Sequence, residues 1–557
     1  MKNAFMTLVI SLVSFLALSA VGNNSRDISK VGPRTEKVNR EMYQKICYVS
    51  INSGSDQNGD GSRDKPWQLL THALSRINDA SESHKYAVLL AEGIYSSGTI
   101  VMKAWVDLYG GFSPQTWERN IFAHRTILEG GRVRRVVVGA SHACLDGFVI
   151  QNGLSRTHGG GILCDDTSPT ISNDAILDNF ALEPQDFNHQ RIHQPGHHGG
   201  GIACLYNATP VIRNNLISGN RTSIGNGGGI AFYGWVRLPG NPKPNSNDNR
   251  LGGGLQALVE NNVITANAAG VNDLQRTRSS NGGGISCAFE ARPIIRNNII
   301  AGNQAYGRGD GGGIYNEYYA DPLIEENWVI GNIADDDGGG IYTMRMGQPL
   351  IARNFIAGNW APAKGVGGIR LSKEGRARIV GNVIVRNLSG GGVVCSDSRM
   401  DLENNIIMHN QGGQAVTYEA RLSYFMPTLI RNNTLRDNEQ EPILVLENYG
   451  QPLIVQSNNI QGQFEGRDNY NAVPAFATNS ITGKATSTHF DAISFTTAVA
   501  IEEPIGDSEQ LAGRVLRLGD RWSVIKAAQS TKILVWGDLG GTHKKMDWEV
   551  ISDYQAK

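Results

Sequence analysis

Two short sequence phrases alternate along most of the chain, and this repeat limits the possible folds more than any other feature. The first phrase, Gly-Gly-Gly-Ile, occurs at residues 159–162, 199–202, 227–230, 282–285, 311–314 and 338–341, with degraded copies at 367–369 and 390–393. The second phrase is Pro-x-Ile-x-Asn-Asn-x-Ile followed by a further Asn, as in residues 210–220 and 293–303. One Asn of this phrase, taken as a marker, recurs from Asn215 to Asn459 at intervals of 23 to 47 residues.

A repeat of roughly 20–50 residues is typical of a solenoid, which grows by adding coils. The segments around both phrases are short and rich in β-branched residues, and they lack a helical period. In a parallel β-helix, equivalent residues of successive coils stack about 4.8 Å apart, so an inward Asn at a turn can bond the backbone of its neighbour. The sequence therefore predicts an all-β chain folded as a single-stranded parallel β-helix.

The cysteines follow the same repeat. If the Ile that ends the glycine phrase points inward, the second residue after it also points inward. Four of the six cysteines then form one interior ladder: Cys164, Cys204, Cys287 and Cys395. We expect them to act as small buried apolar groups. Cys164 and Cys204 fall in adjacent coils, where they could be free thiols or a disulfide.

The two ends of the chain differ from the repeat. Residues 1–22 carry an early Lys, an apolar run and a small-residue exit, which predicts a secretion signal, and the run is too short for a membrane span. We expect a β-helix over residues 45–465, an irregular linking segment over 466–510, and a small β-rich tail over 511–557 that packs on the last coil or forms a module. The mature chain is predicted to be secreted (extracellular, periplasmic or on the cell surface), without an integral membrane span.

The order of features near the N-terminus resembles a known superfamily. A strand at 48–50 is followed by a Gly/Asp/Asn cluster at 54–62, a helix-like segment at 69–77, and strands at 88–95 and 108–112. This order resembles the start of the pectate-lyase-like right-handed parallel β-helix proteins, and the likeness covers about residues 45–465. The resemblance implies a right-handed coil, a short N-terminal helical cap and polysaccharides as ligands. No catalytic signature of the superfamily can be carried over residue by residue.

Candidate catalytic residues occupy outward positions near the glycine phrase. A lyase that cleaves by β-elimination must neutralise a uronate carboxylate and remove the adjacent proton. Charged residues at these positions are predicted to be catalytic, and tyrosines, a lysine and a histidine to bind substrate. The predicted catalytic residues are Arg370, Arg345, Glu317 and Glu290, and the predicted substrate-binding residues are Tyr315, Tyr342, Lys373 and His198. Tyr315, Tyr342 and Arg370 are expected in one outward row. The alternative to a functional row is that they are ordinary solvent-facing residues of a β-sheet.

A second ladder immediately precedes the triple glycine. It consists of His158, His198, Asn226, Asn281, Asp310 and Asp337. Stacked carboxylates at Asp310 and Asp337 need a cation, a proton or backbone amides to offset their repulsion, so we predict either a Ca²⁺ site there or simple turn capping.

These features predict an extracellular protein that recognises an extended polysaccharide and cleaves an acidic one by β-elimination. Two alternatives stay open. A hydrolase would need paired carboxylates such as Glu290 and Glu317, roughly 5–9.5 Å apart. A non-catalytic adhesin would spread its contacts along the stack. Long loops near 181–198, 233–251 and 268–281, expected at one edge, favour a groove. The near-neutral charge of −1 argues against nucleic acid, and we expect a monomer.

Overall fold

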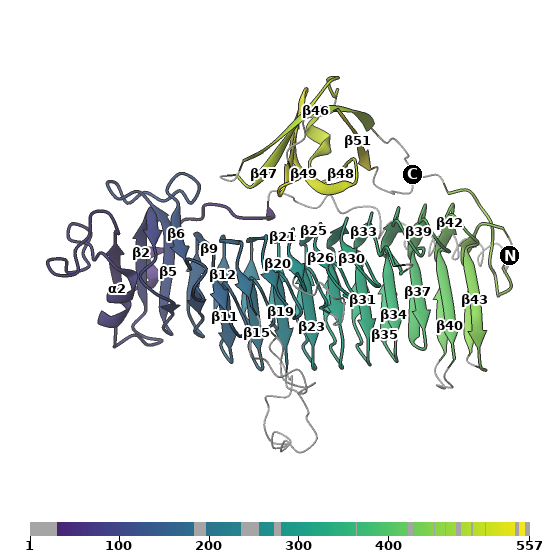
Figure 1. Cartoon of the computed structure of the whole chain (residues 1–557), viewed down its shortest axis with the longest axis horizontal. Helices are drawn as coiled ribbons and strands as arrows, with labels where there is room; N and C mark the ends of the chain where they lie inside the picture. The colour runs from purple at the N-terminus through teal and green to yellow at the C-terminus, as the bar shows by residue number, and fades with distance from the viewer. Residues whose placement is uncertain are drawn as a thin grey trace, which may run out of the picture.

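The computed structural model describes residues 30–182, 197–234, 256–271, 280–363, 365–421, 427–450, 452–462, 464–474, 481–491, 494–506, 508–540 and 545–551 (Figure 1). The predicted secretion signal lies outside these residues, as do most residues of the three long loops. Within the described part of the chain, no helix is long and apolar enough to cross a membrane.

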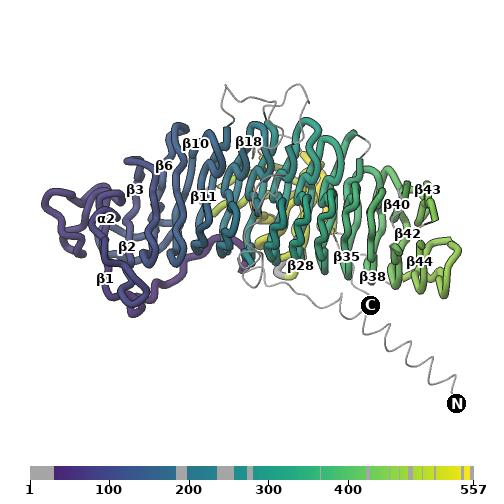
Figure 2. The backbone as a smooth tube through the Cα atoms, turned by 90° about the horizontal axis from the view of Figure 1, so that it is seen from below, coloured from purple at the N-terminus to yellow at the C-terminus, as the bar shows by residue number. Residues whose placement is uncertain are grey.

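The main body is a solenoid of parallel sheets, as predicted. Its coils follow one another in chain order along the long axis (Figure 2). A 14-stranded sheet runs from β1 (Lys45–Val49) to β44 (Leu453–Gln456), a 13-stranded sheet from β3 (Gly93–Tyr95) to β45 (Asn459–Ile460), and a short 6-stranded sheet from β10 (Leu154–Ser155) to β30 (Ile333–Ala334). The 12-stranded sheet consists of β4 (Ile100–Val101), β7 (Val137–Val138), β11 (Ile162–Asp165), β15 (Ile202–Leu205), β19 (Ile230–Tyr233), β23 (Ile285–Ala288), β27 (Ile314–Asn316), β31 (Ile341–Met344), β34 (Ile369–Ser372), β37 (Val393–Ser396), β40 (Val416–Ala420) and β43 (Ile443–Asn448).

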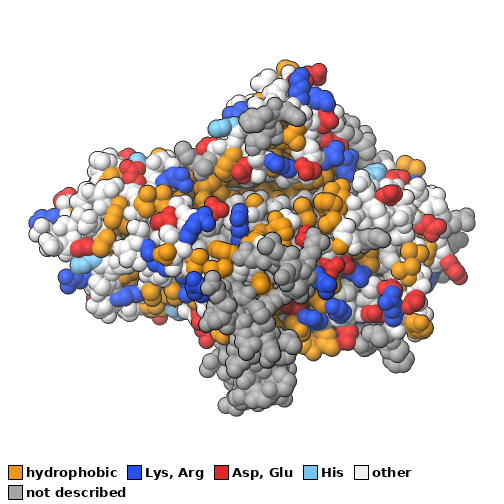
Figure 3. All heavy atoms as spheres, viewed as in Figure 1, with side chains coloured by type: hydrophobic (Ala, Val, Ile, Leu, Met, Phe, Trp, Pro, Cys, Tyr) orange, Lys and Arg blue, Asp and Glu red, His pale blue; other side chains and the backbone are white. Residues whose placement is uncertain are grey.

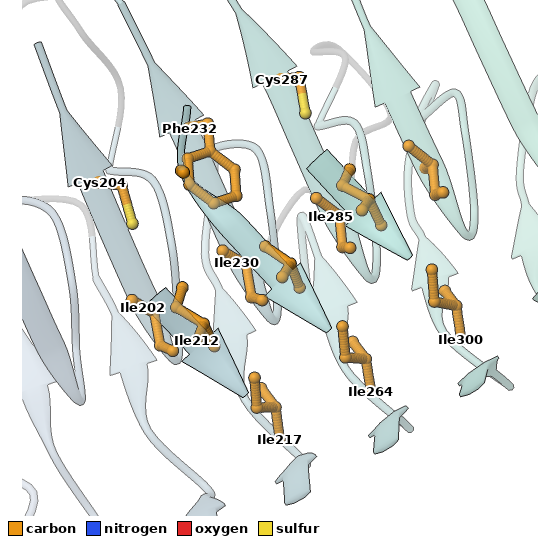
Figure 4. Packing of buried hydrophobic residues seen from close by; sticks show 14 of the residues in the cluster. Ile202, Cys204, Ile212, Ile217, Ile230, Phe232, Ile264, Ile285, Cys287 and Ile300 are labelled. Atoms are coloured by element: carbon orange, nitrogen blue, oxygen red, sulfur yellow. The ribbon is translucent and has the colours of Figure 1, made fainter. Parts of the chain in front are cut away.

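The interior is built from stacked identical residues. Ile202, Ile230 and Ile285 are fully buried and pair in register across β15, β19 and β23 (Figure 4). Cys164 and Cys204 also pair in register, which confirms the interior ladder. All six cysteines are free thiols, and burial raises the pKa of the Cys204 thiol well above its usual range. These thiols therefore pack as apolar groups.

Two asparagine ladders run the length of the coils. In the first, the side-chain oxygen of Asn262 accepts two hydrogen bonds from Asn215, one from the backbone N–H at 2.9 Å and one from the side-chain NH₂ at 3.0 Å. The final Asn of each phrase forms a second ladder of the same kind, in which Asn220 bonds to Asn267. Each buried amide thus satisfies turn backbone groups that water cannot reach.

The Asn-Asn pair of the repeat has two distinct roles. The first residue, such as Asn214 or Asn297, takes left-handed backbone with φ of 56° and 55°, and the second points inward. Asn tolerates this conformation better than most residues. The marker at the last phrase was placed one residue too far: Ser457 is left-handed there, so Asn458 joins the ladder and Asn459 begins β45.

A short helix covers the N-terminal end of the solenoid, as predicted. This helix, α2 (Leu70–Arg76), places Leu70, Ala73 and Leu74 in the main hydrophobic core. Burial of these side chains removes the open apolar end of the first coil from water.

The C-terminal part corrects the predicted boundaries. A closed antiparallel barrel is formed by β46 (Ile481–Asp491), β47 (Thr496–Ile501), β48 (Val515–Leu518), β49 (Arg521–Gln529), β50 (Lys532–Trp536) and β51 (Met546–Ile551). Its first two strands lie within residues 466–510, which we expected to be irregular. Thr and Ser residues make these strands look polar in sequence, although Ala485 and Val499 between them are fully buried.

The barrel lies against the side of the solenoid and not on its last coil (Figure 1). Trp522 and Trp536 pack with Ile330 and Val385 of the outer face of the 13-stranded sheet. Hydrophobic side chains are gathered where the two bodies meet (Figure 3). Trp522 lies so close to Gly358 that a Cβ there would be 2.1 Å from the Trp522 ring.

An extended segment before the first coil, residues 30–39, runs along the solenoid; we call it the N-terminal strap. The Gly32 N–H donates to the Asn261 carbonyl at 2.8 Å, and the ring of Trp536 lies on Gly32. Further along, Arg119 donates to the Glu36 carbonyl at 2.8 Å. The strap therefore connects the barrel, the middle coils and the first coils.

Candidate functional site

The candidate residues lie on the outer face of the 12-stranded sheet, over β27, β31 and β34. Tyr315 pairs with Tyr342, and Tyr342 pairs with Arg370, which confirms the predicted outward row. This alignment follows from the repeat, because residues directly after the inward Ile point outward in every coil.

The two tyrosines point outward but are not exposed. Tyr315 is 1 % and Tyr342 is 5 % exposed, and their rings stack with centroids 5.8 Å apart. The Tyr315 hydroxyl donates to Glu317 at 3.0 Å, and the Tyr342 hydroxyl bonds to Ser372 at 2.7 Å. This burial does not fit open platforms for sugar rings, and it gives Tyr315 a position beside a carboxyl group.

Glu317 is a buried acid of this face that touches a cation. Its side chain is 7 % exposed, and its Oε2 lies 3.0 Å from Arg345 Nη1. Burial raises the pKa of the Glu317 carboxyl, although Arg345, Tyr315 and Lys373 all favour its ionised form. A carboxyl group in this state can accept or donate a proton near neutral pH more readily than an exposed one.

Arg345 and Lys373 stand at a corner of the solenoid, directly after β31 and β34. The Arg345 side chain is 43 % exposed, and its guanidinium carbon lies 4.9 Å from the ring centroid of Tyr318. Tyr318 in turn stacks on Phe289 with ring centroids 4.8 Å apart. Lys373 is exposed and occupies the same corner position as Arg345, one coil further on. This corner offers two positive charges beside an aromatic pair.

The backbone of this corner is unusual in four successive coils. Two consecutive residues take left-handed φ values of 48° to 69°, and none of them is Gly or Asn: Phe289 and Glu290, Tyr318 and Tyr319, Arg345 and Met346, Lys373 and Glu374. Such residues cost about 1–2 kcal/mol each in this conformation, and such strain is concentrated at functional sites. Bonds between coils, such as Glu290 N–H to the Tyr318 carbonyl at 3.0 Å, hold the corner in place. We call these eight residues the left-handed corner; sequence reasoning did not detect it, because no turn residue marks it.

Arg370 is already engaged by other residues. Its Nε lies 2.9 Å from Asp337 Oδ2, and its Nη1 donates to Ser396 at 2.8 Å. Asp337 also accepts the backbone N–H groups of Val366 at 2.7 Å and Gly338 at 3.0 Å. The catalytic role predicted for Arg370 is therefore less well supported than that of Arg345.

The ladder before the triple glycine caps turns. Four members, His158, His198, Asn226 and Asn281, accept the backbone N–H of their counterpart in the next coil, as in Asn226 N–H to His198 Nδ1 at 2.9 Å and Asp310 N–H to Asn281 Oδ1 at 2.9 Å. His198 is 5 % exposed and stacks on Tyr233 with centroids 3.9 Å apart. Burial lowers the pKa of His198 well below its usual range, so the ring is neutral and serves as an acceptor.

The donor set around Asp310 and Asp337 does not fit a Ca²⁺ ion, which takes six to eight oxygen ligands. Asp337 is bound to Arg370 and two amides, and burial raises the pKa of Asp310 well above its usual range, with Asp337 and Asp336 adding to the effect. The described residues contain no group of three or more His, Cys, Asp or Glu side chains placed to hold a metal. The Ca²⁺ site stays a prediction.

Glu290 lies at the second position of its corner turn, whereas Glu317 lies directly after β27 of the next coil. Their pairing as two catalytic carboxyls stays a prediction. The strands that flank the long loops also correct one expectation. The first and third loops follow strands β14 (Phe180–Ala181) and β22 (Ala268–Ala269) of the 6-stranded sheet, but the second follows β19. The three loops therefore leave from two different corners.

Comparisons with known proteins agree with the fold. A family model described as a right-handed β-helix region matches residues 309–460, and a model described as a protein of unknown function, DUF1565, matches residues 52–288. No curated protein matches the chain. The chain is therefore a right-handed parallel β-helix, as the resemblance implied.

Solved structures with some likeness include three proteins of low sequence identity. A GH136 lacto-N-biosidase from Eubacterium ramulus is 13 % identical, with 78 % of this chain and 69 % of that chain covered and a TM-score of 0.35. The A-module of a mannuronan C-5 epimerase from Azotobacter vinelandii is 12 % identical, with coverage of 77 % and 100 % and a TM-score of 0.32. A tailspike protein of the E. coli bacteriophage HK620 is 9 % identical, with coverage of 94 % and 97 % and a TM-score of 0.32.

Proposed function

We propose that this protein is a secreted enzyme that binds an extended acidic polysaccharide at the left-handed corner and cleaves it by β-elimination. The observation that carries the proposal is the bonded cluster of Tyr315, Glu317 and Arg345, in which a buried carboxyl lies under a half-exposed guanidinium. Burial, a charge partner and a perturbed pKa at one surface position are typical of a catalytic site.

Two cations of the left-handed corner, Arg345 and Lys373, can bind carboxylates of an acidic polysaccharide, while Glu290 and Glu374 balance their formal charge. Arg345 and Lys373 occupy equivalent positions on neighbouring coils, which lie about 4.8 Å apart. A guanidinium binds a carboxylate with two parallel hydrogen bonds, and the Lys373 ammonium adds a second positive charge nearby. Binding of a uronate carboxylate to Arg345 would neutralise the group next to the reacting carbon.

The same contact would activate Glu317. When a substrate carboxylate takes Arg345, Glu317 loses its charge partner, and the pKa of its carboxyl rises further because burial is then less offset. Glu317 would remove the proton beside the uronate carboxyl, the released electron pair would form the C=C bond, and the glycosidic C–O bond would break. The leaving oxygen takes a proton, which the Glu317–Tyr315 pair can return.

Hydrolysis is the second candidate, and one observation favours it. Asp310 and Glu317 lie on the same coil, their carboxyl groups both have raised pKa values, and both act on Tyr315. Glycoside hydrolysis uses a pair of carboxyl groups that flank the scissile bond.

The test uses purified mature protein and a panel of polyuronates and neutral glycans, with and without chelator. Ultraviolet absorbance reports the unsaturated product of elimination, and reducing ends report any cleavage. We expect both signals with a polyuronate, and a loss of about 100-fold or more in rate for Glu317→Gln and Arg345→Ala.

The matched control is Arg431→Ala. Arg431 is 42 % exposed and bonds to Glu403 at 2.7 Å, so it copies the exposure and pairing of Arg345 on the 14-stranded sheet. New reducing ends without a rise in ultraviolet absorbance would show that the protein cleaves by hydrolysis and not by elimination. If glycans bind but are not cleaved, the protein is a non-catalytic adhesin. If Arg431→Ala lowers the cleavage rate as much as Arg345→Ala does, the proposed site is wrong.

A further inference from the structure

A cavity of about 280 Å³ lies at the joint between the barrel and the solenoid. It is lined by Arg386, Leu388, His409 and Gln411 of the solenoid and by Arg517 and Trp522 of the barrel. We propose that this cavity is a second carbohydrate site, which binds a carboxylate-bearing sugar residue. It lies on the barrel side, away from the face that carries Glu317, so the proposal does not rest on the proposed cleavage.

Two arginines give the cavity a positive charge. Arg386 Nη1 lies 2.7 Å from one Glu549 oxygen, and Arg517 Nη2 lies 3.2 Å from the other. Glu549 therefore holds one guanidinium from each body in a fixed place, while the three groups together keep a net charge of +1. A guanidinium presents its N–H donors in a planar fork and binds carboxylates with matching geometry.

The other walls fit a sugar ring and not a bare anion. Trp522 and Leu388 give apolar surface, and Gln411 and His409 give side chains that can bond hydroxyl groups. Ligand pockets combine such apolar walls with a few polar groups, and this volume is near the lower end of their usual range of about 300–1,000 Å³. A uronate residue has an apolar ring face, hydroxyls and one carboxylate, which matches these walls.

The location supports a binding site, because clefts between two bodies are frequent ligand sites. The repeat is altered where Trp522 lies. The corner residues before the second Asn ladder are Gly331 and Gly358 beneath the Trp522 ring, and then Arg386 and His409 in the next two coils. The glycines let the ring approach the solenoid, and the two following side chains form the cavity floor.

The experiment is calorimetric titration of the full mature chain with glucuronate, galacturonate and their short oligomers. Glucose and inorganic phosphate serve as the neutral and the simple-anion probes. We expect saturable binding of a uronate, weaker binding of both probes, and a loss of about tenfold or more in affinity for Arg517→Ala and for Gln411→Ala. Arg353→Ala is the matched control, because Arg353 is 44 % exposed and paired with Glu325 outside the cavity.

Small-angle scattering on each variant shows whether the barrel stays docked on the solenoid. If Arg517→Ala releases the barrel, Gln411→Ala still tests the cavity, because Gln411 is not part of the contact with Glu549. Absence of uronate binding, equal binding of phosphate, or equal loss in Arg353→Ala would overturn the proposal. Uronate binding that survives Glu317→Gln but not Gln411→Ala separates this site from the cleavage site.

Discussion

Replacement of Asn327 by Ala tests the physical basis of the coil. Asn327 is fully buried in the first Asn ladder. Its NH₂ donates to the Ile295 carbonyl at 2.8 Å and to Asn354 Oδ1 at 3.0 Å, and its oxygen accepts the N–H and the side-chain NH₂ of Asn298, each at 3.0 Å. Four buried hydrogen bonds, each contributing about 1 kcal/mol, would be lost, so we expect unfolding free energy to fall by about 4 kcal/mol.

The control is the corner Asn of the repeat phrase one coil earlier. Asn297 has φ of 55° and takes the corner position, so Asn297→Gly keeps the required conformation and should change the unfolding free energy by less than about 0.5 kcal/mol. Urea unfolding followed by circular dichroism measures both variants. If Asn327→Ala costs less than about 1 kcal/mol, or no more than the control, the buried hydrogen bonds of the ladder do not stabilise the coil.

Two further predictions concern the joint and the first ladder. Gly358→Ala should release the barrel from the solenoid, because φ is +64° and the new Cβ would meet the Trp522 ring at 2.1 Å. The control is Gly302→Ala, which has φ of +60° and no atom within 4 Å of the new Cβ, so it should add only the strain of a left-handed Ala. Limited proteolysis measures the release of the barrel, and equal cleavage of the two variants would contradict the packing of Trp522 on Gly358. Asp174 replaces Asn in the ladder, its Oδ2 lacks a hydrogen-bond partner within the described structure, and burial raises the pKa of its carboxyl well above the usual range. A carboxyl whose pKa is raised on folding adds stability at low pH, and this stability is lost as the pH rises through the pKa of the folded state. Asp174→Asn should therefore stabilise the protein by about 1 kcal/mol or more at pH 7, with little gain near pH 3. Thermal unfolding at the two pH values measures the gain, and a gain that does not depend on pH would refute the prediction.

The repeat allowed the fold and the register to be predicted from sequence. Because each coil pairs with the next, the position of Ile314 after its glycines also sets Tyr315, Tyr342 and Arg370 in one row. The interior cysteines followed from the same counting. These are local consequences of a period, and a period is visible in the sequence.

The state of the site was not predictable in the same way. The burial of Tyr315 and the engagement of Arg370 by Asp337 depend on side chains of several coils acting together. The left-handed corner carries no Gly or Asn to mark it. The Arg386–Glu549 contact joins residues 163 positions apart in the sequence, beyond the reach of any repeat.

The N-terminal strap has a consequence for the order of assembly. A ribosome releases Gly32 first, but its partners Asn261 and Trp536 are made much later. The coils can pair one after another as they emerge, since each needs only its neighbour. The Glu36 end of the strap can bind Arg119 as soon as the first coils form. The Gly32 end gains its contact with Trp536 only when the barrel is complete, and a truncated product lacking the barrel leaves Val31 without its barrel contacts.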